Sequence, residues 1–342
     1  METLISSRTA QHNFAIGHAS DVAAVRRVGQ KLAESLGFNE VRAGQLALII
    51  TEAATNILKH AGEGQIHVGP AQSAAGIGVD VLALDRGPGI VDLATSLQDG
   101  VSSVGTAGTG LGALRRLADE FDVYSTPGDG AAFFMRLWRD VPPPASGQIE
   151  VGALRTPIAG EEACGDGWAV ACDADGATLL ASDGLGHGPD AARASNAAID
   201  ALAARGAIGA AELVHAAHDA LRATRGAALA AARIDFDGDE LRFAGVGNIA
   251  GVVVEDGRRA LVSHNGIVGH NMRKVQEFAV PFASGALCIL CSDGIQTQWD
   301  LNKYPGLQGR STSLIAAILM RDHSRGRDDA MVLVVRRLAG QG

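Results

Sequence analysis

The sequence is poor in aromatic residues, in cysteine and in long apolar runs. Aromatic residues make up only 4% of the 342 residues, so Ala, Gly, Val and Leu must fill most of the interior. No stretch approaches the roughly 20 apolar residues of a membrane-spanning helix. Residues 1–14 are polar and lack the apolar stretch of a signal peptide. We therefore expect a cytoplasmic protein.

A cluster of basic residues is also missing. The formal net charge is −9, which argues against a nucleic-acid partner, because phosphate backbones are bound by groups of Lys and Arg. Hydrophobic residues account for 47% and charged residues for 20%, the composition of a globular chain. A length of 342 residues is enough for two domains with separate cores.

Two of the four cysteines, Cys288 and Cys291, stand three residues apart within an apolar run. The run is typical of a buried strand, in which an offset of three directs the side chains to opposite faces. This favours buried apolar thiols over a shared metal or a disulfide. Free thiols agree with a reducing compartment.

Residues 140–149 contain three consecutive prolines, which neither a helix nor a central strand accommodates. They predict a short, stiff linker. We therefore expect one domain over residues 1–139 and a second over residues 150–338.

The first half has helical apolar spacing at residues 21–36, with Ser20 as N-cap and Gly37 as stop, and again at residues 39–60. We expect further elements in the order strand, strand, helix, strand, strand, at residues 65–68, 76–84, 111–121, 121–125 and 131–138. This order predicts an α+β domain in which one helical layer covers a mixed sheet.

Strands dominate the second half. We expect them at residues 167–172, 178–182, 227–235, 240–246, 250–255, 261–263, 286–291 and 331–336. Helices are expected at residues 189–205, 210–224 and 311–321. Strand-rich sheets with inserted helices predict a sandwich of two sheets between helical layers, an α/β/β/α arrangement.

The first half also carries a set of residues suited to a nucleotide. Glu52 and Asn56 are one helical turn apart, so they share a face, and Lys59 follows on the next turn. Glu52 could accept a proton and Asn56 could offer a neutral oxygen to Mg²⁺. Asp85 follows an apolar strand and could accept a hydrogen bond from an exocyclic amine. A Glu and an Asn at this spacing are, however, most often only a solvated helix face.

Glycines follow these polar residues. Gly87 and Gly89 would let the backbone approach a flat ring. A second glycine-rich run then enters a helix, whose free amides suit a triphosphate. The residues of this run that we expect to contact the nucleotide are Gly105, Thr106, Gly108, Thr109, Gly110, Leu111 and Gly112. Each glycine alone could equally be a turn.

The ordered motifs over residues 10–138 resemble the GHKL (HATPase) family of ATP-binding domains. The stretches TEAATNILKHAGEGQI, DRGPGI, GTGLGALRRLADEF and PGDG are similar to those of the RsbT-like serine/threonine switch kinases. The resemblance implies that Glu52 is the general base, Asn56 the Mg²⁺ ligand and Asp85 the adenine anchor. It departs at Ala131, where the family usually has Thr, and between residues 101 and 110, where no Arg or Lys is present.

The second half spaces single carboxylates at the ends of apolar strands. Asp183 and Asp293 each occur as Ser-Asp-Gly after such a strand. Asp166 precedes an expected strand, and so do Asp328 and Asp329. Converging carboxylates select Mg²⁺ or Mn²⁺, and two such ions about 4 Å apart can activate water and hold a phosphate. Any single Asp-Gly pair, by contrast, is usually turn chemistry.

The motifs GDGW, LLASDGLGHGPDAARAS, FAGVGNIAGVVV, LCSDGI and RDDAMVLVV resemble the RsbX/SpoIIE-like branch of the metal-dependent protein phosphatase 2C family. The resemblance implies that Asp183 bridges both metals with help from the Gly184 carbonyl. It implies that Asp166, Asp293 and Asp328 complete the metal shells. Asp329 is the less favoured ligand of its pair. His187, Asn248, His264 and His270 could line the pocket, although structural roles are favoured for the last three.

Together the two resemblances predict a bifunctional regulator of a bacterial partner-switching pathway that controls a stress response or a sigma factor. One domain would phosphorylate Ser or Thr of a STAS-domain protein, such as an RsbS/RsbR-like antagonist or scaffold, with Mg-ATP. The other would dephosphorylate such a protein with two Mn²⁺ or Mg²⁺ ions. A downstream phosphatase or sigma regulator is a further candidate partner. The alternative makes the first domain a non-catalytic, ATP-dependent binding module, with only the phosphatase active.

Overall fold

The computed structural model describes residues 3–8, 11–73, 76–97, 110–140, 147–272 and 274–339. Contacts between these residues divide the chain into two compact units. We call residues 11–140 with 306–318 the helix-on-sheet unit, and residues 3–8, 147–305 and 319–339 the two-sheet unit. None of the described helices combines the length and the apolar character that a membrane span requires.

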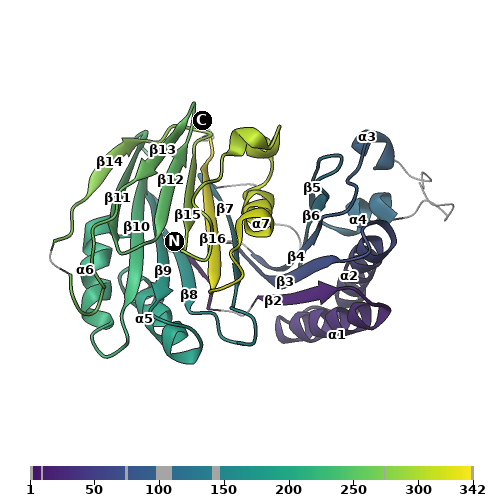
Figure 1. The fold of residues 1–342 in the computed structure, drawn as a ribbon, viewed down its shortest axis with the longest axis horizontal. Coiled ribbons are helices and arrows are strands. Elements are labelled where there is room, and N and C mark those ends of the chain that lie inside the picture. The colour runs from purple at the N-terminus through teal and green to yellow at the C-terminus, as the bar shows by residue number, and fades with distance from the viewer. Residues whose placement is uncertain are drawn as a thin grey trace. The chain divides into compact units, whose positions relative to one another are not determined.

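The helix-on-sheet unit contains a five-stranded sheet in the order β2-β3-β4-β6-β5. Its elements are β2 (His12–Ile16), α1 (Ala19–Ser35), α2 (Glu40–His60), β3 (Gly64–Ser73), β4 (Gly76–Asp85), α3 (Leu93–Ser96), α4 (Gly110–Leu117), β5 (Glu120–Ser125) and β6 (Ala131–Trp138). The two long helices, α1 and α2, lie against one face of the sheet (Figure 1). We predicted a mixed sheet. All four strand pairs of this sheet are antiparallel instead.

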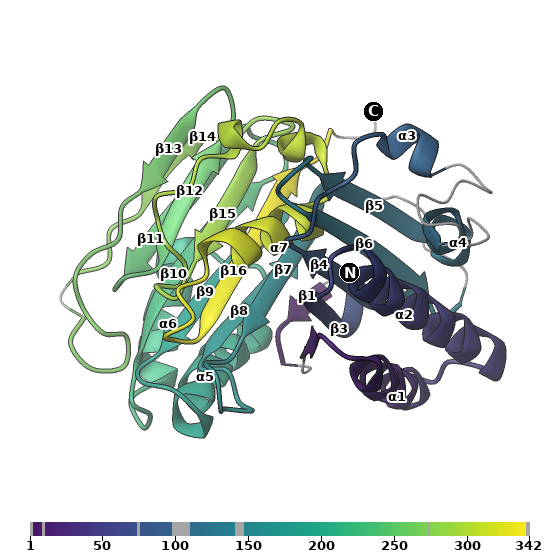
Figure 2. The same cartoon turned by 45° about the vertical axis from the view of Figure 1, so that its right-hand side comes forward.

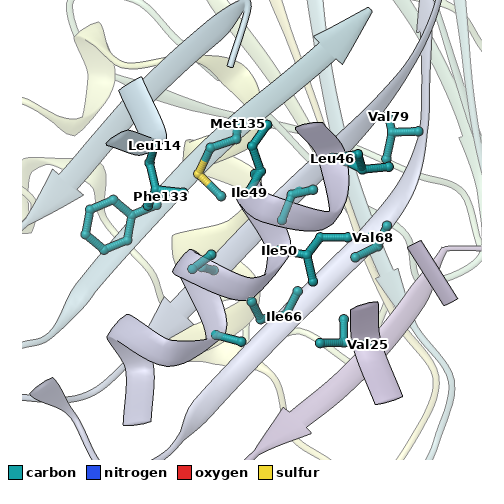
Figure 3. Close-up of a cluster of buried hydrophobic side chains, with 14 of the residues drawn as sticks. Val25, Leu46, Ile49, Ile50, Ile66, Val68, Val79, Leu114, Phe133 and Met135 are labelled. Carbon is teal, nitrogen blue, oxygen red and sulfur yellow. The ribbon is translucent and has the colours of Figure 1, made fainter. Parts of the chain in front are cut away.

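The core of this unit lies between the helices and the sheet. In Figure 3, Ile50 of α2 lies near Ile66 and Val68 of β3, which alternate with residues of the opposite face, and Ile49 lies beside Met135 of β6. All five side chains are fully buried. This packing fixes the orientation of α2 and therefore of the polar residues on its other side.

The helix ends depend on local hydrogen bonds. Asn39 caps α2 by accepting a hydrogen bond from the Arg42 amide at 2.9 Å, as helix N-caps do. The N-cap of α1 is His18 rather than the predicted Ser20, because the Asp21 carboxylate accepts from the His18 amide at 2.8 Å. The residue after the α1 cap is Gly37, at φ 76°, a conformation that favours glycine.

The two-sheet unit contains a six-stranded sheet, β1-β8-β9-β10-β11-β14, and a five-stranded sheet, β13-β12-β15-β16-β7. The strands are β1 (Thr3–Ser6), β7 (Ile149–Thr156), β8 (Asp166–Cys172), β9 (Gly176–Gly184), β10 (Ala227–Asp235), β11 (Glu240–Val246), β12 (Ala250–Val254), β13 (Arg258–Leu261), β14 (Phe278–Pro281), β15 (Leu287–Cys291) and β16 (Ala330–Arg337). The helices after β9 are α5 (Pro189–Arg205), α6 (Ala210–Ala220), η1 (Leu301–Lys303), η2 (Leu307–Gly309) and α7 (Thr312–His323), of which residues 306–318 are grouped with the other unit.

Each face of the six-stranded sheet has its own core. Residues such as Val170 and Leu179 pack against Leu290 and Leu333 of the five-stranded sheet. The outer face is covered by α5 and α6, which lie together beside β8, β9 and β10 in both views (Figures 1 and 2). The strand β15 holds Cys288 and Cys291 as buried free thiols, and burial raises the pKa of each to about 12.

The first strand of the chain differs from expectation. We predicted no strand before residue 21, yet β1 pairs with β8 in the two-sheet unit and β2 with β3 in the other. Residues 3–8 therefore group with the second half of the chain, although the prediction of a first domain over residues 1–139 included them. Of the predicted linker 140–149, residues 141–146 lie outside the described part of the structure.

Candidate nucleotide and metal sites

The helix α2 presents Glu52 and Asn56, both half-buried, one turn apart. The Asn56 side-chain nitrogen is buried and finds no hydrogen-bond partner among the described residues. A buried amide without a partner costs about 1–3 kcal/mol, so its retention favours a ligand that it would contact. Lys59 follows on the next turn and is exposed.

Asp85 ends β4 and is held by the backbone. One carboxylate oxygen accepts hydrogen bonds from the Gly87 amide at 2.8 Å and from the Ala131 amide at 3.2 Å. Ala131 lacks the hydroxyl of the Thr that the family usually has there, but its backbone amide orients the carboxylate. The half-buried Asp85 is thus fixed at the strand end, in a position to accept from an amine.

Two glycines permit a close chain crossing next to Asp85. A Cβ at Gly89 (φ 70°) would lie 2.3 Å from the Thr126 carbonyl oxygen. A Cβ at Gly130 (φ 81°) would lie 2.1 Å from the Asp85 carbonyl oxygen. Any larger residue would force these segments apart and displace Asp85.

The glycine-rich run is only partly described. Gly105, Thr106, Gly108 and Thr109 lie outside the described residues. The helix α4 begins at Gly110, Gly112 is buried, and Leu111 packs against the core. Of the predicted glycine-rich run and the helix that follows it, the structure therefore describes the helix, from Gly110 onward.

In the two-sheet unit, Asp166 and Asp183 are direct cross-strand partners on β8 and β9, so their side chains lie on the same face. Asp166 is fully buried, and its Oδ2 has no hydrogen-bond partner among the described residues. The Ser292 side chain lies where it partly offsets the rise in the pKa of Asp166, and its hydroxyl accepts from the Met331 amide at 2.9 Å. Two carboxylates of one sheet are therefore brought together where β8 begins and β9 ends.

Asp293 and Asp329 reach this place from the other sheet. A Cβ at Gly294 would lie 2.0 Å from the Asp329 carbonyl oxygen, so the two segments cross in contact. Asp329 accepts from the Ile158 and Gly165 amides at 2.7 and 2.6 Å, while the exposed Asp328 accepts from the Asp329 amide at 2.9 Å. These contacts leave Asp328, rather than Asp329, turned toward solvent.

The electrostatics of the cluster agree with this convergence. Burial raises the pKa of Asp183 to about 7, with smaller contributions from Asp293, Asp328 and Asp329. Burial first, and then the Asp183 charge, raise the pKa of Asp166 well above its usual range. Burial and Asp328 likewise raise the pKa of Asp293. Each negative charge in this cluster therefore makes ionisation of its neighbours less favourable.

No three His, Cys, Asp or Glu side chains in the described ranges already enclose a cation-sized space. The strands nevertheless bring the carboxylates into one region, because Asp166 pairs with Asp183 across β8 and β9 and the Gly294 segment crosses Asp329 in contact. The unpartnered Oδ2 of buried Asp166 and the oxygen-only donor set fit Mg²⁺ or Mn²⁺.

Asn248 and His187, which we predicted could line the pocket, lie near the cluster, as do three residues that the sequence analysis did not identify, Ser195, Ser292 and Glu161. Asn248 donates to Asp293 at 2.7 Å, and Ser195 donates to the Gly165 carbonyl at 2.5 Å. His187 pairs with Glu161 at 2.8 Å. Ser292 could have been found from the sequence, because it is the Ser of a Ser-Asp-Gly motif. No sequence pattern pointed to Ser195 or Glu161.

The histidines favoured for structural roles are held by the fold. His264 stacks on Phe278 with ring centroids 6.1 Å apart. The His270 ring nitrogen lies 3.1 Å from the Thr224 carbonyl oxygen.

Family models match both halves of the chain. Residues 18–136 match the histidine kinase-like ATPase domain, and residues 173–338 match stage II sporulation protein E (SpoIIE). Serine/threonine-protein kinase RsbT of Bacillus subtilis (strain 168) is 36% identical over 118 residues, which are 34% of this chain and 89% of RsbT.

Solved structures are also similar. One, from work on the bacterial stressosome as a modular system adapted to control secondary messenger signaling, is 30% identical with a TM-score of 0.52, over 56% of this chain and 100% of that one. RsbX in complex with magnesium shares the fold, with 20% identity and a TM-score of 0.50, over 56% of this chain and 96% of that one. The chain therefore belongs, through its first half, to the family of the serine/threonine kinase RsbT, and it joins this histidine kinase-like ATPase domain to a SpoIIE domain with the protein phosphatase 2C fold.

Proposed function

We propose that this protein adds a phosphoryl group to Ser or Thr of a partner protein with one domain and removes such a group with the other. The observation that carries the proposal is the presence, in one chain, of two separate sites of opposite chemistry. One has a single backbone-held carboxylate and an unpartnered amide. The other has Asp166 opposite Asp183 on neighbouring strands of one sheet, and Asp293 and Asp329 beside strand ends of the other sheet.

In the kinase reaction the hydroxyl oxygen of the partner's Ser or Thr forms a bond to the γ-phosphorus of ATP, and the bond to ADP breaks. Glu52 accepts the hydroxyl proton as general base. Asn56 provides a ligand to Mg²⁺, and Lys59 one turn later faces the phosphates. Asp85 accepts from the adenine amine, with Gly87, Gly89, Gly105, Thr106, Gly108, Thr109, Gly110, Leu111 and Gly112 forming the rest of the nucleotide pocket.

In the phosphatase reaction, water forms a bond to phosphorus, and the bond to the Ser or Thr oxygen breaks as that oxygen takes a proton. Asp183, the Gly184 carbonyl, Asp166, Asp293 and Asp328 would hold the divalent cations. When bound, Mn²⁺ or Mg²⁺ supplies Lewis-acid activation of water and phosphate. Asp329 orients the cluster instead, because both of its oxygens accept backbone amides.

The proposed partner is a STAS-domain protein of the RsbS/RsbR type, within a partner-switching pathway that controls a stress response or a sigma factor. The RsbT and stressosome relatives support this class of partner. With both activities in one chain the opposing enzymes are always present in equal amounts. The level of phosphorylation is then set by signals that act on one domain relative to the other.

The test is a time course with the whole protein, a candidate STAS protein, γ-labelled ATP and Mn²⁺. We expect Asp183→Ala to accumulate more labelled partner than the parent, and Glu52→Ala to produce none. A separate arm adds the purified phosphorylated partner, which the parent and Glu52→Ala should dephosphorylate and Asp183→Ala should not. Equal labelling in all three proteins contradicts the proposal.

A second candidate function is supported by Ala131. The family usually has Thr there, and here only the backbone amide reaches Asp85. The ATPase domain would then bind ATP to hold a partner without transferring phosphate. In that case ATP would increase partner binding equally in the parent and in Glu52→Ala, with no label transferred.

A further inference from the structure

The first strand of the chain is part of the phosphatase domain, although the ATPase domain follows it in sequence. The strand β1 pairs with β8 from Thr3 opposite Cys172 to Ser6 opposite Ala169. The Ser7 amide continues the ladder by donating to the Trp168 carbonyl at 2.9 Å, and the Ser7 hydroxyl accepts from the Trp168 amide at 3.0 Å. The segment thus ends two residues along β8 from Asp166.

This segment is packed as well as paired. Ile5 contacts the core between the two sheets, and Ser6 and Ser7 are buried. Arg8 forms an exposed ion pair with Asp200 of α5. Without residues 3–8, β8 would be an open edge strand, and the amide and carbonyl of Trp168 would lose their partners.

One guanidinium connects this segment to the acidic cluster. Arg155 lies on β7, at the edge of the other sheet. One of its terminal nitrogens donates to the Asp166 carbonyl at 2.9 Å, and the other donates to the Ser7 carbonyl. Arg155 therefore ties both sheets together at the residue where β8 begins.

Charge strengthens the same contact. Burial lowers the pKa of Arg155, and the nearby negative charges of Asp166 and Asp329 partly offset this effect. A buried guanidinium needs fixed acceptors, and the Ser7 and Asp166 carbonyls supply two of them. Loss of β1 would remove one of these acceptors and let the start of β8 move.

We propose that residues 3–8, through the Ser7–Arg155–Asp166 contacts, position the Asp166 carboxylate for cation binding, and that Arg155 is a positioning residue of the phosphatase. The inference rests on the phosphatase activity proposed above. Removing a group that orients a metal ligand commonly weakens metal affinity about 10- to 100-fold. The metal affinity of the phosphatase would thereby depend on residues 3–8, which precede the ATPase domain in the sequence.

The variant Arg155→Met removes the guanidinium with little change in volume, and Ser7→Ala removes only the hydroxyl that accepts from Trp168. The matched control is Arg8→Ala, which breaks an exposed ion pair of the same segment. Mn²⁺ binding to the full chain is measured by electron paramagnetic resonance without substrate. Hydrolysis of a phosphoserine peptide is then measured against Mn²⁺ concentration, and ATP binding to each variant reports on the other domain.

We expect Arg155→Met to weaken Mn²⁺ binding about 10-fold or more, with hydrolysis at saturating Mn²⁺ within about threefold of the parent. Ser7→Ala should shift in the same direction by less, whereas Arg8→Ala and ATP binding stay unchanged. If Arg155→Met is folded and binds Mn²⁺ as tightly as the parent, while Asp183→Asn loses Mn²⁺ binding, this inference is overturned and the phosphatase proposal stands. A parent protein that binds no Mn²⁺ overturns the phosphatase proposal and this inference with it.

Discussion

The ATPase and phosphatase domains hold acidic residues at strand ends in different ways. In the ATPase domain Asp85 accepts from two backbone amides. In the phosphatase domain Asp166 and Asp183 face each other across neighbouring strands, and the pKa of each is raised by burial. In the function proposed above, the first site orients one charge toward an adenine amine, whereas the second accumulates negative charge that bound cations would neutralise. The two domains should therefore respond oppositely to charge removal and to acid.

The largest expected difference comes from Asp183→Asn. Phosphoserine hydrolysis should fall by about 10³-fold or more, because a central metal ligand is lost. In the presence of a chelator the same variant should melt at a higher temperature than the parent, since repulsion within the buried cluster is relieved. Calorimetry and a peptide phosphatase assay measure the two effects. A variant that is both inactive and less stable in the chelator would contradict the proposed repulsion.

The pH dependence of stability should have opposite signs in the two domains of the metal-free protein. Burial lowers the pKa of His67 in β3 to about 4, from 6.5. The unfolded state therefore binds the extra proton first, and the ATPase domain loses up to about 3 kcal/mol as the pH falls from 6.5 to 4. The pKa of Asp183 is raised to about 7, so the phosphatase domain gains stability as the pH falls from 7 toward 4.

Amide hydrogen exchange followed by mass spectrometry separates these two slopes. The variant His67→Leu should flatten the slope in the ATPase domain only, and Asp183→Asn should flatten part of the slope in the phosphatase domain only. If stability changes with pH in the same direction in both domains, other titrating groups dominate the pH dependence.

A smaller effect is expected from Asp85→Asn. The amide keeps an oxygen for the Gly87 and Ala131 hydrogen bonds but loses the charge that would accept from an adenine amine. ATP affinity should fall about 10-fold, since a charged hydrogen bond is worth about 1.5–3 kcal/mol, with phosphatase activity unchanged. Isothermal calorimetry measures the affinity. Unchanged ATP binding would remove Asp85 from the nucleotide site.

The smallest expected effect is a pair of glycine substitutions in one turn. Gly130→Ala places a Cβ 2.1 Å from the Asp85 carbonyl oxygen, whereas at Gly128 (φ 89°) a Cβ meets nothing within 4 Å. Gly128→Ala should cost about 1 kcal/mol from its backbone conformation, and Gly130→Ala about 1–2 kcal/mol more. Urea denaturation measures both. Equal losses would mean that the crossing next to Asp85 is not tightly packed.

Local patterns in the sequence predicted both architectures and the elements that carry several of the candidate site residues. The Ser-Asp-Gly motifs placed Asp183 and Asp293 at strand ends, and helical spacing placed Glu52 and Asn56 on one face of α2. These features depend on residues within a few positions of one another, which is why one sequence was enough. The contribution of Asn248, which donates to Asp293, depends on a contact between distant segments.

The strand β1 shows why the remainder was not predicted. It is four residues long, two of them polar, and its partner β8 begins at Asp166. Neither its length nor its pattern distinguishes it from a loop, because pairing with a distant strand supplies its stability. Arg155 was missed for the same reason, since its acceptors, Ser7 and Asp166, lie on two other strands.

The position of β1 also has a consequence for synthesis of the protein. Residues 3–8 leave the ribosome before the ATPase domain, but their partner strand emerges only after that domain has been made. At about 5–20 residues per second this delay is on the order of ten seconds or more, long enough for the intervening domain to fold. The six-stranded sheet is therefore completed after the ATPase domain has formed, by a segment that was synthesised before it.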